Sequence, residues 1–442
     1  MWNETSAGGL GPRRSTIVRR VVEYILGERH GVPLANIDFF AGSMDHLIVE
    51  PEAVRRSLYL EDSVAAGKGF ANAVTAFDEL AKEIKELKDI PLEVSAVQPC
   101  TPELRYSSVF TPSPRRLKDF DRLPASLRHI EPLEFHLALE GSGSWPDDLE
   151  AVQKIKSAFL AKMGEGLEAR RSVLKAEVVV EVDARPIDDN VSLEILTAAG
   201  WAFRARIYYD RSQILLEERE EQLGDAAAAS TSSHLSPLDS HLQRFVHAPR
   251  HHGAMCALQN HFPSFSPTVR LLKRWASAHM LSAHFDHEQL ELVAASVFLD
   301  PASPFDPPQS GATGFARAMD RLATWKWRDE PLLVPVYSFT QATSSARRAV
   351  LPVADRQAAV ESFQALRLAK PNVDEHAWVI ATEADLDGTV WGRRAGKVVA
   401  ARIRGLAKAT LATLQAGVAA GSLVVEVRSD LSLLFLAAAR LY

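Results

Sequence analysis

The sequence is poor in cysteine, in long apolar runs and in net charge. Only Cys100 and Cys256 occur in 442 residues, too few for a disulfide framework, which fits a reducing compartment. No apolar run approaches the roughly 20 residues of a membrane-spanning helix, and the opening MWNETSAGGLGPRR lacks the apolar core of a secretory signal. A net charge of -6 argues against a basic coat for nucleic acid, although it leaves room for a local basic face. We therefore expect no membrane contact.

The chain contains enough apolar residues, 47% of the total, for two or three domains. Helical spacing at about 72 to 88 and 149 to 163 alternates with the strand-like stretches PLEVSAVQ, 133 to 139, AEVVVEVDA and WAFRARIYY. The segment GDAAAASTSSHLSPLDS has few large apolar residues and is typical of a linker. Mostly helical patterns follow it. The sequence predicts an α/β unit, a linker and a helical unit.

The strand at 133 to 139 carries the first candidate site. Its alternation places Glu134 and His136 on the face opposite to Leu133, Phe135 and Leu137. Nucleotidyltransferases of the DNA polymerase β type need two carboxylates at i and i+2 of such a strand, because two magnesium ions bridge the attacking hydroxyl and the phosphates. Histidine is a poor ligand for that hard ion. The metal face is therefore incomplete.

Other parts of that chemistry are present only in outline. Ser142 follows Gly141 in the way of a phosphate-holding Gly-Ser turn, and Glu181 and Asp183 offer a third carboxylate at the end of the strand 177 to 183. We expect no catalytic residues here, and we treat Ser142, Glu134, His136 and Asp183 as positions of a degenerate site. The alternative is an active template-independent RNA nucleotidyltransferase that uses Glu134, Glu181 or Asp183.

Several other polar clusters have simpler structural interpretations. Asp147 followed by Glu150 is a capping-box pattern for the helix from 149. Asp385 and Asp387 lie in a glycine-containing turn that we expect to be solvated. We expect no metal site at the cluster of His247, His251, His252 and Cys256, because it lacks a second ligand pair. We expect an ordinary loop at Gly42, Ser43 and Asp45.

A basic face is expected on the helix within SPTVRLLKRWASAHML. Ser266 would cap this helix, and Val269, Leu272, Ala276 and Met280 would form its apolar stripe. Arg270, Lys273 and Arg274 then share another face, which could meet phosphates or simply be solvated. Arg204 and Arg206 are further candidates for RNA contacts.

Five long segments resemble the nucleolar RNA-associated protein (Nrap) family over about residues 16 to 415. They are SFSPTVRLLKRWASAHML, FDHEQLELVAASVFLDP, TGFARAMDRLATWKWRDEPLLV, PLEVSAVQPCTPELRYSSVF and LEGSGSWPDDLEAVQ. The resemblance implies an α+β fold: a nucleotidyltransferase-like α/β domain and a mostly helical domain like those of poly(A) polymerase and oligoadenylate synthetase, both non-catalytic. It also implies that the chain is a fragment or a shortened gene model of the later half of a longer scaffold.

The resemblance also suggests a domain map. We expect the end of a preceding domain and a connecting helix at 1 to 65, the nucleotidyltransferase-like domain at 66 to 221 and a flexible linker at 222 to 240. The helical domain would occupy 241 to 400. The start of a truncated C-terminal domain would follow at 401 to 442, and the sequence departs from the family after about residue 421.

The family is a subunit of the small-subunit processome, which implies location in the nucleus and nucleolus. The expected role is a scaffold and a binding module for RNA and protein in pre-rRNA processing. The partners would be pre-rRNA or small nucleolar RNA and other processome proteins, including an rRNA-processing partner subunit, and we expect no cofactor and no metal. A scaffold that binds only proteins is the further alternative.

Overall fold

The computed structural model describes most of the chain. The described ranges are 14–33, 44–57, 68–88, 90–125, 128–141, 145–181, 187–223, 236–300, 306–341, 350–369, 371–372, 376–391 and 395–419. The chain divides into an α/β unit, formed by residues 50–106 and 111–253, and a helical unit, formed by residues 1–49, 107–110 and 254–442. Among the described helices, none is both long and apolar enough to cross a membrane.

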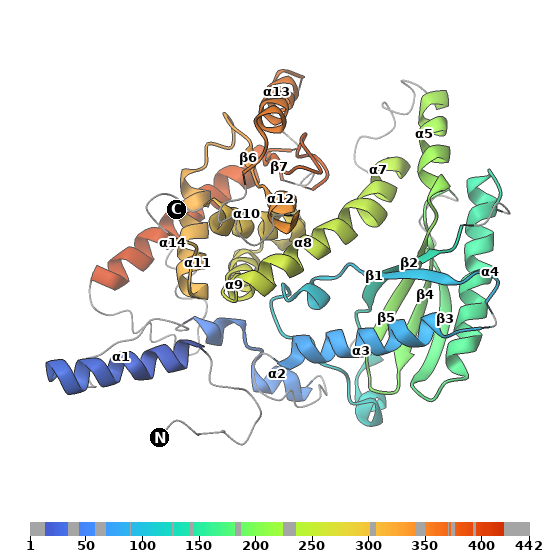
Figure 1. Ribbon diagram of the computed structural model, residues 1–442, viewed down its shortest axis with the longest axis horizontal. Helices are drawn as coiled ribbons and strands as arrows, with labels where there is room; N and C mark the ends of the chain where they lie inside the picture. Colours follow the sequence, from blue (N-terminus) through green and yellow to red (C-terminus); the bar gives the residue numbers. More distant parts are fainter. Residues whose placement is uncertain are drawn as a thin grey trace. The chain divides into compact units, whose positions relative to one another are not determined.

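The α/β unit is built on a five-stranded mixed sheet of order β1-β2-β5-β4-β3 (Figure 1). Its strands are β1 (Val94–Pro99), β2 (Leu133–Leu139), β3 (Val173–Val180), β4 (Val191–Thr197) and β5 (Ala202–Tyr208). β2 and β5 pair in parallel and the other neighbours are antiparallel. Alternation in LEFHLAL buries Phe135 and Leu137 completely, as period-two patterning predicts.

Helices α3 (Lys68–Lys85) and α4 (Leu149–Glu168) pack on the core face of this sheet. Phe77 of α3 lies 5.5 Å from the ring of Phe135 and 6.3 Å from that of Phe203. The remaining helices of the unit are α2 (Glu52–Ser57), η3 (Pro102–Arg105), η4 (Leu117–Arg122), α5 (Arg211–Leu223), α7 (Pro237–Leu242) and η6 (Gln243–His247), a π-helical turn that continues into α8 (Ala248–His261). The core face therefore belongs to α3 and α4, and polar residues occupy the other face.

The helical unit has its core between α9 (Phe265–Ala278), α10 (His287–Leu299), α11 (Gly311–Thr324) and α14 (Lys397–Ala419) (Figure 1). Trp275 is fully buried and donates its indole N–H to Thr410 Oγ1 at 3.0 Å. The other elements are α1 (Arg14–His30), η2 (Asp45–Ile48), η7 (Ser282–His284), α12 (Val336–Gln341), α13 (Val353–Ala369) and the short parallel pair β6 (Leu332–Leu333) and β7 (Ile380–Ala381).

Two expected boundaries differ from the structure. The chain passes between units at Gly253 and Ala254, later than the linker expected at 222–240, because His241 and Phe245 pack within the α/β unit. Residues 224–235 of that linker lie outside the described residues. The boundary expected at residue 400 falls inside α14, whose Ile403 and Ala407 are fully buried in the helical core. The described part of 401–442 therefore belongs with the helical unit.

Several element ends also differ. Helix α9 ends at Ala278, so Met280 is 88% exposed and does not extend the apolar stripe expected for it. Its N-cap is Ser264, and Ser266 lies inside the first turn. Helix α4 begins after Asp148, which accepts a hydrogen bond from the Glu150 N–H at 3.2 Å. The capping residue is thus Asp148 and not Asp147.

Candidate functional site: a charge cluster on the sheet

The polar face of the two central strands carries the candidate site. The parallel register of β2 and β5 places Glu134 beside Arg204 and His136 beside Arg206. These four positions share the face opposite to the core, because alternate strand residues point the same way. A catalytic nucleotidyltransferase would place a third carboxylate on the neighbouring strand. Here the neighbouring strand supplies arginines.

Arg206 links the carboxylates around it. Its side chain is 2% exposed, and its Nε lies 3.2 Å from Glu134 Oε1. Its Nη2 pairs with Glu181, and its Nη1 donates to the Asp189 carbonyl at 3.1 Å. A guanidinium with several fixed acceptors is held rigidly. Arg206 therefore occupies the space between carboxylates whose oxygens a divalent cation would need as ligands.

Asp189, just before β4, is the second focus of charge. Lys156 of α4 donates to its Oδ1 at 2.6 Å, and Arg206 and Arg244 approach its Oδ2 at 3.7 and 3.8 Å. Arg244 also donates to the Asp189 carbonyl at 2.9 Å. We call these linked side chains the charge cluster. Its members are Glu134, Glu181, Asp189, Lys156, Arg206 and Arg244. Three carboxylates and three cations balance within it.

Side chains from η6 cover the same face. The ring of Phe245 lies 4.6 Å from that of His136 and 5.3 Å from the Lys156 ammonium. His136 is 1% exposed, with its Nδ1 3.2 Å from the Cys100 thiol and its Nε2 3.6 Å from Glu134 Oε1. The strand face is thus packed under an aromatic side chain of the same unit.

The cluster fixes the charge states of its members. Burial raises the pKa of Glu134, but the hydrogen bond with His136 and the charges of Arg206 and Arg244 outweigh it and lower that pKa to about 2. Burial opposes ionisation of Asp189 as well, yet Lys156, Arg206 and Arg244 hold its pKa below the usual range. Burial lowers the pKa of His136, so its imidazole is neutral near pH 7.

This donor set does not fit a pair of magnesium ions. Glu134 is the one carboxylate of the strand pair, and its Oε1 already faces Arg206, His136 and, at 3.9 Å, Arg244. Magnesium requires oxygen ligands in nearly octahedral geometry. No group of three or more His, Cys, Asp or Glu residues in the described part of the chain is arranged to hold a metal.

The structure places the other expected positions as follows. Ser142 and Asp183 lie outside the described residues. Glu181 follows β3 and joins the charge cluster. Arg204 pairs with Glu194 of β4 at 2.6 Å and keeps 26% of its side chain exposed. The fold therefore brings Glu134, His136 and Arg206 together. Arg204 lies on the same strand as Arg206, two residues earlier, and is the register partner of Glu134.

The basic residues of α9 do not form one open face, because Lys273 is buried while Arg270 and Arg274 are partly exposed. Lys273 is 4% exposed and its ammonium lies 2.5 Å from Glu291 Oε1, which is itself fully buried. Arg270 donates to the carbonyls of Val109 and Ile48 at 3.0 and 2.7 Å. Arg274 lies over the ring of Phe110. The expected solvent-facing basic surface is therefore absent for Lys273, because its partner lies on α10.

The remaining clusters are structural in character. His251 and His252 are buried within α8 and Cys256 is half-buried on the same helix. Asp385 accepts from the backbone N–H groups of Thr389 and Val390 at 3.3 and 3.0 Å, which makes a turn. Residues 34–43, with Gly42 and Ser43, lie outside the described residues.

The sequence interpretation missed half of the charge cluster. Asp189 adjoins β4, a strand that was not predicted, and Lys156 and Arg244 lie on helices that bring them to the sheet only through the fold. The one available signal was a lysine at a position of α4 next to its apolar stripe, since Lys156 is 1% exposed. A charge that falls among buried positions of a helix indicates a buried partner.

The sheet, its covering helices and the carboxylate strand define a nucleotidyltransferase-like domain, and a poly(A) polymerase/oligoadenylate synthetase-like helical domain follows it. The family model described as Nrap protein nucleotidyltransferase domain 4 matches residues 45–260, and that described as Nrap protein PAP/OAS1-like domain 5 matches residues 262–436. The chain belongs to the Nrap family. The expected fold class and family are confirmed.

Individual relatives are considerably longer than this chain. It is 32% identical to Nucleolar protein 6 of Mus musculus over 332 residues, 72% of this chain and 27% of that protein. It is 31% identical to U3 small nucleolar RNA-associated protein 22 of Schizosaccharomyces pombe over 346 residues, 78% of this chain and 29% of that protein. The chain thus spans less than a third of the length of these relatives.

One solved structure is distantly similar. Terminal uridylyl transferase 4 from Trypanosoma brucei, with bound CTP, is similar at 10% identity with a TM-score of 0.42, over 84% of this chain and 96% of that one. A likeness this distant says nothing about activity.

Proposed function

We propose that this chain consists of a non-catalytic nucleotidyltransferase-like domain and a helical domain. Together they act as a scaffold and binding module in maturation of the small-subunit ribosomal RNA in the nucleolus. The names of its relatives, Nucleolar protein 6 and U3 small nucleolar RNA-associated protein 22, support this setting. Its partners would be pre-rRNA or small nucleolar RNA and other proteins of the same assembly.

The observation that carries the non-catalytic part is Arg206. Arg206 lies on β5, the strand that pairs with the strand of Glu134. Its guanidinium lies between the carboxylates, with Nε 3.2 Å from Glu134 Oε1. A fixed cation at this place competes with a metal ion for the same oxygens. Phe245 packs over the adjacent His136 and covers this second position of the strand pair.

The test of this part is incubation of the purified chain with a short RNA, each labelled nucleoside triphosphate, and magnesium or manganese. We expect no extension, either by the wild type or by Glu134→Ala. Metal-dependent extension by the wild type that disappears in Glu134→Ala and Asp183→Ala would overturn the proposal in favour of an active nucleotidyltransferase. A known active terminal transferase in the same buffer serves as the positive control.

For the RNA-binding part, we propose the basic residues that keep some exposure: Arg204, Arg270 and Arg274. Arg204 is the clearest because 26% of its side chain is exposed. Phosphate contacts make binding dependent on salt, with a slope of about 0.7 per contact for single strands. We expect Arg204→Ala to lower that slope by about one contact.

Filter retention of a single-stranded RNA at several potassium chloride concentrations measures the slope. The matched control is Lys162→Ala, since Lys162 is exposed and pairs with Glu165 on α4. Equal slopes for the wild type, Arg204→Ala and the Arg270→Ala/Arg274→Ala variant would remove the assigned contacts. If the wild type itself retains no RNA on the filter, the result would favour a scaffold that binds only proteins.

A further inference from the structure

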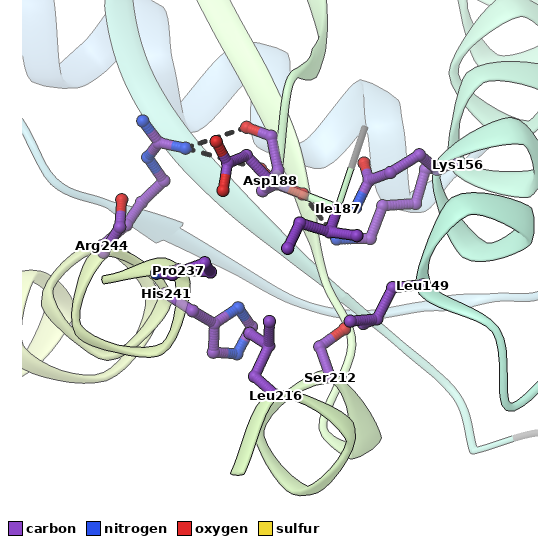
Figure 2. Close-up of a pocket in the computed structure, with 12 residues that line it drawn as sticks. Leu149, Lys156, Ile187, Asp188, Ser212, Leu216, Pro237, His241 and Arg244 are labelled. Carbon is purple, nitrogen blue, oxygen red and sulfur yellow. Dashed lines mark hydrogen bonds and ion pairs between the residues drawn. The ribbon is translucent and has the colours of Figure 1, made fainter. Parts of the chain in front are cut away.

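The cations beside the sheet of the α/β unit are already paired. A cleft lined by Lys156, Asp189 and Arg244, among others, adjoins the charge cluster (Figure 2). Its volume is about 20 Å³, which is room for about one water molecule. Lys156 and Arg244 both pair with Asp189 there. An RNA strand would therefore have to meet other cations of the chain.

The sequence from 388 to 425 is strongly basic. It contains six arginines and lysines and no aspartate or glutamate, in a chain whose net charge is -6. Four of the six lie on α14 of the helical unit, and the other two lie just before it, outside the described residues. A local excess of positive charge on an acidic chain produces a surface that attracts anions. The six are Arg393, Arg394, Lys397, Arg402, Arg404 and Lys408.

The fold turns one side of α14 outwards. Its inner side is held in the helical core by apolar residues such as Ile403, which is fully buried. Successive residues of a helix are about 100° apart around its axis, which places Lys397, Arg404 and Lys408 within about 40° of one another. Lys408 is exposed, and the other two are partly exposed. We call these three residues, with the exposed Arg402 that flanks them, the basic face of α14.

The stability of the helix does not account for these charges. Lys397 is the first residue of α14, where the helix dipole disfavours a positive charge. Arg404 and Lys408 are four residues apart, a spacing at which like charges repel each other. Among the residues that the structure describes, neither Arg402 nor Lys408 has an acidic partner. Positive charge that opposes helix formation and lacks an internal partner indicates an external anion.

The residues between the cations favour a strand of phosphates over a protein as the ligand. Where its side chains are described, the exposed apolar residues of α14 are Val398 and the alanines Ala401, Ala412 and Ala416. Protein interfaces are instead enriched in aromatic residues and depleted in lysine. Arginine and lysine are the usual contacts of phosphate oxygens. The small side chains also leave room for a strand to approach the cations.

We propose that the basic face of α14 binds the phosphate backbone of an RNA strand. At a rise of 1.5 Å per residue, Lys397 and Lys408 lie about 16 Å apart along the helix, which corresponds to about five nucleotides at 3.4 Å each. Phosphate contacts carry no sequence information, so this face holds RNA of any sequence. The inference rests on the proposed binding of RNA and adds a contact surface in the helical unit.

The test is filter retention of a labelled oligouridylate by the full chain at several potassium chloride concentrations. The variant is Lys397→Gln/Arg402→Gln/Lys408→Gln, in which three positive charges of the basic face are removed. It leaves Arg404 in place, because the Arg404 Nε donates to the Ala323 carbonyl at 3.2 Å. Poly-L-glutamate and unlabelled oligouridylate are compared as competitors of the labelled RNA.

The matched control removes the same charge elsewhere. It is Lys85→Gln/Lys88→Gln/Lys154→Gln, a change of three exposed lysines of the α/β unit. The melting temperature of each variant is compared with that of the wild type. If the triple variant of α14 melts lower, the single variant Lys408→Gln takes its place, because Lys408 is exposed.

Each phosphate contact contributes about 0.7 to the slope of log affinity against log salt for a single strand. We expect the triple variant to lower the slope by about 2, the single variant to lower it by about 0.7, and the control to keep it. Retention with the same slope in the wild type and the α14 variant, or an equal fall in the control, overturns the assignment to α14 and keeps the proposed function.

Two further outcomes concern the kind of ligand. Absence of retention by the wild type removes the RNA-binding part of the proposed function and this inference with it. Displacement of the RNA by poly-L-glutamate as readily as by unlabelled oligouridylate overturns the assignment of RNA to this face in favour of an acidic protein segment.

Discussion

The two units both bury charged side chains, but they do so in different ways. In the helical unit, Lys273 and Ser107 both donate to Glu291 Oε1, at 2.5 and 2.6 Å, and all three residues are at most 4% exposed. In the α/β unit, the charge cluster adjoins a cleft whose polar atoms lack partners among the described residues. The pair in the helical unit satisfies its buried charges within itself, whereas the charge cluster lies next to polar atoms that have no hydrogen-bond partner among the described residues.

Loss of the Lys273–Glu291 pair in the helical unit should have the largest effect on stability. Glu291→Ala leaves the Lys273 ammonium buried without its carboxylate, and such a loss costs about 3–5 kcal/mol. We expect this variant to unfold at much lower denaturant concentration than the wild type, as followed by far-UV circular dichroism. The matched control is Lys273→Met/Glu291→Leu, which removes both charges and should recover most of the loss. Equal destabilisation by the control would show that packing, not charge, holds this site.

The charge cluster should respond to acid. The folded-state pKa of Glu134 is lowered to about 2, below its ordinary value, so its stabilisation is present above about pH 4.5 and is lost as pH falls towards 2. At about 1.4 kcal/mol per pKa unit, this is about 3 kcal/mol. Asp189 acts in the same direction, since its pKa is also lowered. Unfolding free energies measured from pH 6 to pH 3 should fall in the wild type.

The control for this acid response is Glu134→Gln. It keeps the shape and a hydrogen-bond acceptor but has no charge, so we expect lower stability at pH 6 and a flatter decline towards pH 3. A decline as steep as that of the wild type would show that Glu134 is not held by Arg206 and Arg244 in the folded state.

Asp385 provides a contrasting carboxylate, because no arginine or lysine offsets the effect of burial on its pKa. Burial raises the pKa of Asp385 to about 6, and the charge of Asp387 adds to this against three backbone hydrogen bonds. The sign is opposite to that of Glu134: the folded state holds the proton more tightly, so stability is lost as pH rises from about 4 through 6. Two pKa units correspond to nearly 3 kcal/mol, and partial exposure reduces the effect to about 2 kcal/mol.

Asp385→Asn tests this sign. Asparagine is neutral at every pH and keeps an acceptor for the Thr389 or Val390 N–H, so the variant should be more stable than the wild type above pH 6. Their stabilities should converge near pH 4. A variant that is less stable at pH 7 would show that the backbone hydrogen bonds of Asp385 outweigh its buried charge.

The sequence could predict features that depend on residues close together in the chain, but not those that depend on contacts between distant residues. The alternation of LEFHLAL gave the strand and the correct faces of Phe135 and His136, because a strand's period is local. The identity of the partners was not local. Lys273 meets Glu291 through the packing of α9 on α10, and Arg206 meets Glu134 through a strand register that no local pattern determines. A basic triplet at helical spacing was therefore interpreted as surface when one of its members was core.

The smallest expected effect concerns exposed charge, where neighbouring aspartates differ. Asp148 caps α4 by accepting the Glu150 N–H, and loss of an N-cap costs about 1 kcal/mol. Asp147 instead pairs with Arg211 at 2.6 Å while both side chains are at least half exposed, and such a pair contributes between about 0 and 1 kcal/mol. We expect Asp148→Ala to lower the melting temperature more than Asp147→Ala. Added salt should weaken the effect of Asp147→Ala alone, because its pair is screened by ions whereas the cap hydrogen bond is not. The reverse order would return the cap to Asp147, the residue that the capping-box pattern favoured.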